Sequence, residues 1–592
     1  MTYQPPIDDI MLALRSAVGL DGLIADGTYA GLDADTVRAI IEEAGKFGAE
    51  VLDPLNWPGD RQGSKLSNGT VETPAGWKAA YRQFIESGWS ALPCPEDYGG
   101  QGLPGVLSMA ACEIWNATNM SFGLCPLLTQ GAIDAIHADG SDELKAIYLP
   151  KMVSGEWTGT MNLTEPQAGS DLAAIRTKAV RKDDGTYRIF GTKIFITYGD
   201  HEMTDNIVHL VLARVEGAPS GTKGISLFVV PKKLVNADGT LGARNDVICA
   251  GLEHKLGIHA SPTCVMKFGE GDGAIGFLVG QENRGLNTMF IMMNAARLAV
   301  GIQGVAIAER ATQRAMAYAK DRRQGRTASS KPGEMGPIVE HADIRRTLLT
   351  MKSLTQAARA ICLVTAREID ISHRAGNEAQ RLSASNKAAL LTPIAKAFST
   401  DIGCEVASMG VQIHGGMGFV EETGAAQYYR DARILPIYEG TNGIQAIDLA
   451  IRKLPLEGGA VAKAFIAEIA DTASAVKASN RPEFGRLGDR LVEAVAALGV
   501  ATEFMGRCVK DNQDAALAGA TPYLRLFGLA AGGHYLARAA LNASRDQSDG
   551  AGPIALARFF AENLLVAAPG LAEAVTGGAD AILDVDPHRL SA

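Results

Sequence analysis

Residues 430–445 read RDARILPIYEGTNGIQ, an apolar segment that ends in a chain reversal and leads into a new helix. The helix is predicted from apolar residues that recur at helical spacing, namely Ile444, Ile447, Ile451 and Leu454. Thr441 or Asn442 can cap its first turn, and Gly440 lets the backbone bend sharply. The reversal therefore presents one carboxylate, Glu439, between a hydrophobic segment and a helix start.

The carboxylate of Glu439 is a candidate general base. Ile437, Tyr438 and a glycine flank it, and partial desolvation by such neighbours raises the pKa of a carboxyl group toward that of a useful base. The alternative is that Glu439 only complements a helix dipole, which is the commoner situation for an isolated glutamate. The rest of the chain has to decide between the two.

Size and composition narrow the class of protein. At 592 residues the chain is long enough for three to four domains, and 47% hydrophobic with 21% charged residues is ordinary globular composition. The net charge of −10 argues against a general nucleic-acid binder, which needs a basic surface. The eight cysteines form no C-x-x-C pair, so neither a disulfide framework nor a structural zinc site is expected.

The sequence shows no targeting or membrane signal. The first residues, MTYQPPIDD, lack a basic n-region and an apolar h-region, and no uncharged apolar run approaches the roughly 18 residues of a membrane span. We expect a soluble, cytoplasmic protein that binds neither nucleic acid nor membrane.

Four regions differ in their patterning. Residues 1–157 are predicted to be mostly helical, and residues 158–280 carry short strands at 187–197, 207–213, 224–230 and 264–268. Residues 281–455 contain long helices at 295–320, 344–372, 384–409 and 442–454, which fit a four-helix bundle. An alanine-rich, amphipathic tail at 456–592 predicts a helical extension. The fold class is mainly α with a central antiparallel β-domain, a barrel or sandwich.

Nucleotide-binding motifs of the common kinds are missing. There is no G-x-G-x-x-G after a strand and no G-x-x-x-x-G-K-[ST], so Rossmann and P-loop folds lose their main support. The glycine-rich run at 415–418 follows a helical segment and by itself indicates only a turn.

Five segments taken in order carry more information. They are MNLTEPQAGSD at 161–171, GTKIFIT at 191–197, NAAR at 294–297, RRQGR at 322–326 with VEH at 339–341, and QIHGGMGF at 412–419 with YEGT at 438–441. This arrangement resembles the acyl-CoA dehydrogenase family over about residues 80–455. The resemblance implies a flavoprotein built from a helical domain, a β-barrel and a four-helix bundle, with FAD between the last two and in contact with a neighbouring subunit.

The resemblance also implies roles for matching positions. The expected FAD-binding residues are Met161, Leu163, Thr164, Gly169, Ser170, Phe195, Ile196, Thr197, Arg322, Gln324, His341, Gln412, Gly415, Gly416, Thr441 and Gly443. The expected substrate-binding residues are Ser170, Asn294, Arg297, Glu439 and Gly440. No metal site is expected.

Simple chemistry agrees with several of these roles. Guanidinium groups bind phosphate oxygens well, and glycines let a phosphate approach closely, although an exposed helix end would also explain Arg322 and a helix cap the glycines. Phe195 offers a flat apolar surface, but packing in a β-core would explain it equally. For His341 an ordinary surface histidine remains the alternative.

The implied reaction is α,β-dehydrogenation of an acyl-CoA thioester. Glu439 removes the proton next to the thioester carbonyl, the flavin accepts the hydride, and the carbonyl oxygen needs stabilisation as charge develops. The family uses the backbone N–H of the base residue and a flavin ribityl hydroxyl for this purpose. An electron-transferring flavoprotein is the expected electron acceptor.

Departures from the short family pattern point to one branch. These are the QGR run at 324–326, an apparent insertion at 327–336 and the tail beyond residue 456, which together resemble the long bacterial branch. That branch implies a short, sulfur-containing substrate, 3-methylthiopropanoyl-CoA, and a place in dimethylsulfoniopropionate degradation. A tail covering the surface used by tetrameric relatives predicts a homodimer. Met289, Met292 and Met293 either line the acyl pocket or belong to the core.

Other functions stay open at this point. They are dehydrogenation of short or medium straight-chain acyl-CoA, an acyl-CoA oxidase that lets oxygen reach the flavin, dehydrogenation of an acyl chain on a carrier protein, and a non-catalytic flavin protein that binds nucleic acid. The acidic net charge and the presence of Glu439 speak against the last of these.

Overall fold

The computed structural model describes residues 3–236, 238–544 and 551–590, and it divides them into two compact units. Of these residues, the first unit contains 3–45, 105–117, 297–544 and 551–590, and the second contains 46–104, 118–236 and 238–296. Three of the described helices pass from one unit to the other, α3 (Ala34–Phe47), α6 (Gly105–Asp139) and α8 (Gly285–Asp321). The backbone of α6 leaves helical geometry at Asn119, close to this division.

The first unit is helical. Its bundle helices are α8, α9 (Ala342–Arg374) and α10 (Glu378–His414), followed by the short helices α11 (Ala425–Ala432) and α12 (Asn442–Ile447). The N-terminal helices α1 (Ile7–Ala13), α2 (Leu20–Ala25) and the greater part of α3 (Ala34–Phe47) belong to the same unit. The long helices agree with the sequence prediction, but α8 begins ten residues before the expected start. The predicted helix at 442–454 continues beyond α12 only as a wider turn at Asp448–Lys453.

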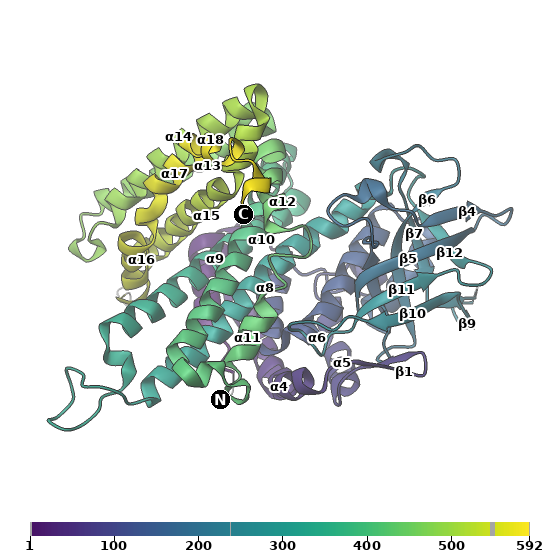
Figure 1. Ribbon diagram of the computed structural model, residues 1–592, viewed down its shortest axis with the longest axis horizontal. Helices are drawn as coiled ribbons and strands as arrows, with labels where there is room; N and C mark the ends of the chain where they lie inside the picture. Colours follow the sequence, from purple (N-terminus) through teal and green to yellow (C-terminus); the bar gives the residue numbers. More distant parts are fainter. Residues whose placement is uncertain (1–2, 237, 545–550, 591–592) are drawn as a thin grey trace. The chain divides into compact units, whose positions relative to one another are not determined.

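The C-terminal tail is folded and completes the first unit (Figure 1). Its helices are α13 (Ala460–Ala478), α14 (Leu487–Asp511), α15 (Gln513–Ala543), α16 (Ala551–Asn563), α17 (Ala568–Gly577) and α18 (Ala579–Leu583). The predicted amphipathic character of the tail is confirmed, since its apolar residues Phe465, Ile469, Leu491 and Leu498 are buried. An ion pair between Arg525 on α15 and Glu405 on α10, at 2.8 Å, ties the tail to the bundle.

Close packing of α15 on α10 gives a first prediction. A Cβ added at Gly528 would lie 2.3 Å from the ring of Phe398, so we expect Gly528→Ala to overpack the contact and lower the free energy of unfolding by about 1–3 kcal/mol. Gly506→Ala on α14 is the matched control. A Cβ there meets nothing within 4 Å, so it should raise stability by up to about 1 kcal/mol through helix propensity. Chemical denaturation measures both, and equal effects would contradict the packing argument.

The second unit combines helices with a sheet. In the described part of this unit, helices α4 (Asp53–Gln62), α5 (Trp77–Glu86), the second part of α6 and α7 (Asp142–Val153) accompany twelve strands. The strands are β1 (Lys65–Ser67), β2 (Thr70–Glu72), β3 (Trp157–Asn162), β4 (Lys178–Arg181), β5 (Tyr187–Thr197), β6 (Asn206–Val215), β7 (Ser226–Pro231), β8 (Lys233–Val235), β9 (Leu241–Arg244), β10 (Val247–Leu252), β11 (Thr263–Phe268) and β12 (Ala274–Val279).

Eight strands form one sheet in the order β10-β11-β5-β12-β7-β6-β3, with β4 paired to both β5 and β6. The path β4-β5-β12-β7-β6 therefore returns to β4 and closes a small barrel, which agrees with the predicted barrel. Most pairs are antiparallel as expected, but β3 and β4 each run parallel to β6. Strand β6 is buried along nearly its whole length, because both of its faces are covered.

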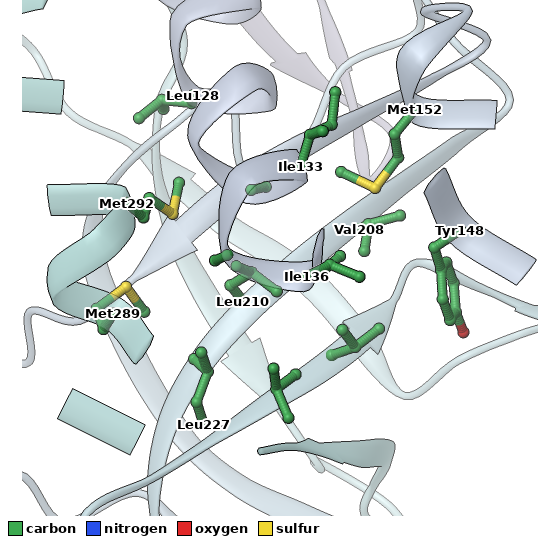
Figure 2. Packing of buried hydrophobic residues seen from close by; sticks show 14 of the residues in the cluster. Leu128, Ile133, Ile136, Tyr148, Met152, Val208, Leu210, Leu227, Met289 and Met292 are labelled. Atoms are coloured by element: carbon green, nitrogen blue, oxygen red, sulfur yellow. The ribbon is translucent and has the colours of Figure 1, made fainter. Parts of the chain in front are cut away.

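One face of β6 packs against helices in the hydrophobic core of the second unit (Figure 2). Val208 and Leu210 of β6 meet residues of α6 and α7, including Ile133, Ile136 and Met152. Met289 and Met292 of α8 are completely buried in this cluster, and Met293 packs against it. These methionines therefore belong to the core, the second of the two alternatives that the sequence left open.

Two helical stretches are long and apolar enough to cross a membrane by length and composition alone, Gly285–Asp321 and Gly552–Gly577. Most of the apolar stretch within Gly285–Asp321 is buried inside the protein, as in a core helix. Most of the apolar stretch within Gly552–Gly577 is not buried.

Candidate active site

Glu439 lies in the reversal between α11 and α12 of the first unit. Its backbone has φ of 56° and that of Gly440 has φ of 82°, so two consecutive residues adopt the left-handed conformation. Thr441 caps α12, because its side chain accepts a hydrogen bond from the backbone N–H of Ile444 at 3.4 Å. The predicted reversal and cap are confirmed, but the positive φ of Glu439 itself was not foreseen and is costly for a residue with a Cβ.

The carboxylate of Glu439 has the electrostatics of a base. Although the residue retains some accessible surface, desolvation by the surrounding protein raises its pKa to about 7, against the opposing effects of Lys396 and Arg297. Of its predicted apolar neighbours, Ile437 is half exposed and contributes less than expected. Tyr438 is held by a hydrogen bond from its hydroxyl to the side chain of Gln303.

Arg297 is a buried side chain on α8, and one of its guanidinium nitrogens lies 3.5 Å from Asp448. Its charge lowers the pKa of Glu439, which places the two predicted residues in one electrostatic neighbourhood. Asn294, one turn earlier on α8, is exposed and belongs to the second unit. Gly443 lies in the first turn of α12, two residues after Thr441.

Three predicted FAD contacts meet at the loop after α8. The side chain of Arg322 donates to the amide oxygen of Gln324 at 3.3 Å, and a ring nitrogen of His341 lies 2.8 Å from the backbone oxygen of Gln324. Arg322 and Gln324 are exposed, so their polar groups are accessible. The predicted insertion at 327–336 is an irregular loop next to this cluster.

The glycine run lies at the end of α10. Gln412 is exposed in its last turn, and Gly415, with φ of 59°, follows the helix. A Cβ placed on Gly415 or Gly416 would meet no atom within 4 Å, so open space lies beside both residues. His414 stacks on Tyr318 with ring centroids 4.4 Å apart, which fixes the end of the helix.

The remaining predicted contacts lie in the second unit. Met161 is in β3, and the loop that follows carries Leu163 and Thr164, whose backbone oxygen accepts from the N–H of Ile194 on β5 at 2.9 Å. Thr164 is thus brought beside Phe195, which is 58% exposed and has φ of 61°.

The other residues of this group differ in exposure. Gly169 and Ser170 are exposed on the same loop, and Thr197 at the end of β5 is partly exposed and pairs with Thr263. Ile196 is only 2% exposed and its side chain packs in the barrel core, so only its backbone is available for a ligand.

Domains of known protein families match four consecutive segments of the chain. The N-terminal domain of acyl-CoA dehydrogenase matches residues 34–156, the middle domain 160–270 and the C-terminal domain 283–454, and a domain described as acetyl-CoA dehydrogenase C-terminal like matches 465–586.

Individual relatives agree with these domains. A 3-methylmercaptopropionyl-CoA dehydrogenase of Ruegeria pomeroyi is 48% identical, over 98% of this chain and 99% of the relative. The chain belongs to the acyl-CoA dehydrogenase family. A butyryl-CoA dehydrogenase of Syntrophomonas wolfei is 38% identical over 79% of this chain and 78% of its own length. The FAD complex of an acyl-CoA dehydrogenase from Bacillus anthracis shares the fold, with a TM-score of 0.72 at 20% identity over 95% of this chain and 90% of that one.

This acyl-CoA dehydrogenase is therefore an FAD-dependent oxidoreductase that dehydrogenates acyl-CoA. Its residues suit the cofactor on both units, considered separately. Phe195 presents an exposed aromatic ring, and the open space beside Gly415 and Gly416 leaves room for a group from outside the chain. The non-catalytic alternative is set aside.

Sequence reasoning missed Glu165, which organises the loop that carries Thr164. Its carboxylate accepts hydrogen bonds from the hydroxyl of Thr177 at 2.6 Å, from the backbone N–H of Arg176 at 2.6 Å and from the buried ammonium of Lys193 at 2.8 Å. Burial raises the pKa of Glu165, but Lys193 and these donors outweigh it and bring the value to about 2. The sequence offered one signal for this ion pair, a glutamate in the motif at 161–171 and a lysine in the motif at 191–197.

Lys396 on α10 was missed as well. Its side chain is completely buried, and its ammonium group donates to the backbone oxygen of Gly440 at 2.9 Å. The available signal was one charged residue inside the apolar run LTPIAKAF, at 391–398. A charge in such a run rarely remains buried without a partner.

Proposed function

We propose that Glu439 is the base that removes the α-proton of a short acyl-CoA thioester, and that 3-methylthiopropanoyl-CoA is the preferred substrate. The observation that carries the first part is a desolvated carboxylate with a pKa of about 7, held on a sharp turn. A base whose pKa lies near neutrality is at least half ionised at pH 7–8 and still accepts a proton readily.

The backbone of Glu439 supports a second role. Within the described part of the chain, no protein group accepts a hydrogen bond from the N–H of Glu439. Such an N–H is available for the thioester oxygen, on which negative charge develops as the α-proton leaves. A bound FAD would supply the acceptor for the hydride that leaves the β-carbon. Arg297 and Gly440 adjoin the base and are the proposed substrate-binding residues of the first unit. In the second unit, the proposed substrate-binding residues are Ser170 and Asn294.

The FAD contacts remain a proposal for each unit. In the second unit, the proposed contacts to FAD are Met161, Leu163, Thr164, Gly169, Ser170, Phe195, Ile196 and Thr197. In the first unit, the proposed contacts to the remainder of FAD are His341, Gln412, Gly415, Gly416, Thr441 and Gly443, and Arg322 and Gln324 are proposed to contact the FAD of a neighbouring subunit. We also propose that the chain consists of four domains, with boundaries after residues 157, 280 and 455.

The substrate proposal rests on similarity along the whole chain. The relative named 3-methylmercaptopropionyl-CoA dehydrogenase matches this chain from end to end, including the tail, whereas the butyryl-CoA dehydrogenase covers about four fifths of it. We further propose a cytoplasmic homodimer that passes electrons to an electron-transferring flavoprotein.

A matched pair of thioesters tests the substrate. Pentanoyl-CoA differs from 3-methylthiopropanoyl-CoA by one methylene in place of sulfur, so the two fill nearly the same volume. We expect kcat/KM to be highest for the sulfur compound and within about tenfold for pentanoyl-CoA, because an apolar pocket discriminates weakly between isosteres. Butanoyl-CoA and octanoyl-CoA complete the panel. A preference for octanoyl-CoA would contradict the proposal, and hydrogen peroxide formed in air would identify an oxidase.

A further inference from the structure

The turn that carries Glu439 needs support from its surroundings. Glu439 and Gly440 are both left-handed, and this conformation is unfavourable for glutamate because its Cβ crowds the backbone. Residues with such backbones persist only when neighbouring structure holds them in place. The hydrogen bonds of this turn therefore identify what fixes the base.

The main support is Lys396, which comes from the neighbouring helix α10. Its ammonium group donates to the backbone oxygen of Gly440 at 2.9 Å and to the side-chain oxygen of Asn442 at 2.8 Å. It thus bridges the residue after the base and the first residue of α12. A completely buried ammonium group is stable only with such partners.

Asn442 extends the support along α10. Its amide nitrogen donates to the backbone oxygen of Ala397 at 3.1 Å, to the hydroxyl of Thr400 at 3.0 Å and to the carboxylate of Asp401 at 2.7 Å. The side chain of Gln445 adds longer hydrogen bonds to the backbone oxygens of Glu439 and Gly440, at 3.3 and 3.4 Å. The turn is therefore attached to one rigid helix by several polar contacts, of which Lys396 alone is cationic.

The charges that face this site come from several elements. Lys396 and Arg297, on α10 and α8, face the carboxylate of Glu439. Lys396 in turn faces Glu439, Asp401 and the thiol of Cys404, and is repelled by Arg297.

Arg297 has charged neighbours of its own. Burial, in turn, lowers the pKa of Lys396. Arg297 faces Asp448 and Glu439, and is repelled by Arg452. Desolvation lowers the pKa of Lys396 to about 7, against the pull of Glu439 and Asp401.

We propose that Lys396 is a positioning residue for the base: it fixes the backbone of the Glu439 turn through Gly440 and Asn442, and its charge favours the ionised form of the Glu439 carboxylate. This inference rests on the proposed role of Glu439. A lysine that only filled a polar gap between α10 and α12 would hold the turn but would not affect the titration of the base. The two roles are therefore separable by a pH profile.

The test uses the full-length, FAD-loaded enzyme with pentanoyl-CoA under anaerobic conditions, where the bleaching of flavin absorbance reports the chemical step at each pH. In Lys396→Met, loss of the cation raises the pKa of Glu439, so the acid limb of the rate profile moves to higher pH by about one unit. The limiting rate at high pH falls by about tenfold, because the turn is loosened. Lys396→Gln keeps a donor without the charge and should move the limb with a smaller loss of rate.

Two further variants separate geometry from charge. Asn442→Ala removes hydrogen bonds but no charge, and should lower the limiting rate with the acid limb unmoved. Lys387→Met is the matched control on the same helix, where the lysine pairs with Glu468 on α13, and should leave both quantities unchanged. A wild-type acid limb in Lys396→Met and Lys396→Gln would overturn the proposal.

Failure of the Lys396 variants to fold and a wrong assignment of the base each need a separate experiment. If neither Lys396 variant folds, Lys396→Arg replaces them: it keeps the cation but changes the position of the donors, so the limiting rate must fall while the acid limb stays near that of the wild type, and an unchanged limiting rate or a limb moved to higher pH overturns the proposal. Glu439→Gln tests the base itself. Normal bleaching in that variant removes the base, whereas its loss together with an unmoved limb in the Lys396 variants removes only the positioning role.

Discussion

Glu439→Gln is expected to lower kcat/KM for acyl-CoA by about 10³-fold while FAD stays bound, in line with the loss of a general base. The amide has nearly the same size and shape as the carboxylate and occupies the same left-handed backbone at the same cost. It cannot accept the α-proton, however. The expected result is therefore a folded, yellow enzyme whose flavin absorbance no longer bleaches when acyl-CoA is added without oxygen.

The control is a glutamate on the neighbouring helix. Glu378→Gln, in the exposed first turn of α10, makes the same chemical change and should leave turnover unaltered. Measured rates should be compared at equal flavin content, so that a lost cofactor is not mistaken for a lost base. Turnover of Glu439→Gln within about tenfold of the wild type would contradict the assignment.

Local chemistry made part of this site predictable. The pattern at 430–445 predicted a helix start, and Thr441 and Gly440 have the backbone roles expected of a cap and a bend. The desolvation of Glu439 was predicted from its apolar neighbours in the sequence. Because Ile437 is half exposed, part of the desolvation must come from other residues. Packing from elements distant in sequence supplies the rest, and a local pattern carries no information about it.

Residues that act through partners far along the chain were not predictable. Lys396 precedes Gly440 by 44 residues, and their hydrogen bond depends on how α10 packs against the turn. The pair formed by Glu165 and Lys193 joins two motifs that the sequence could only read separately. In each case the sequence shows a charge in an apolar setting, but its partner is decided by tertiary structure.

The sheet shows the same division between local and distant information. Alternating apolar residues predicted the strand at 187–197 with its observed bounds, and the short turns predicted antiparallel pairing, which most of the strand pairs show. The parallel pairing of β3 and β4 with β6 was missed, because no crossover helix of a βαβ unit marks it in the sequence.

Arg359→Met is expected to lower the free energy of unfolding of the first unit by about 3–5 kcal/mol, the usual cost of leaving a buried charge without its partner. Arg359 on α9 is completely buried and donates to both carboxylate oxygens of Glu113 on α6, at 2.6–3.0 Å, and to Glu309 on α8 at 2.9 Å. Lys352 lies 3.6 Å from Glu309 and extends the network. Methionine fills much of the space but leaves the carboxylate of Glu113 uncompensated.

The pH dependence and two further variants make this prediction specific. Burial already raises the pKa of Glu113, and loss of Arg359 raises it further, so the deficit should grow as the pH rises above about 4.5, where the unfolded carboxyl ionises. Glu113→Gln combined with Arg359→Met removes the uncompensated charge and should recover part of the loss. Arg346→Met, on the same helix but in an exposed pair with Asp343, should change the denaturation midpoint too little to measure. Equal effects of Arg359→Met and Arg346→Met would mean that the buried network contributes nothing beyond a surface ion pair.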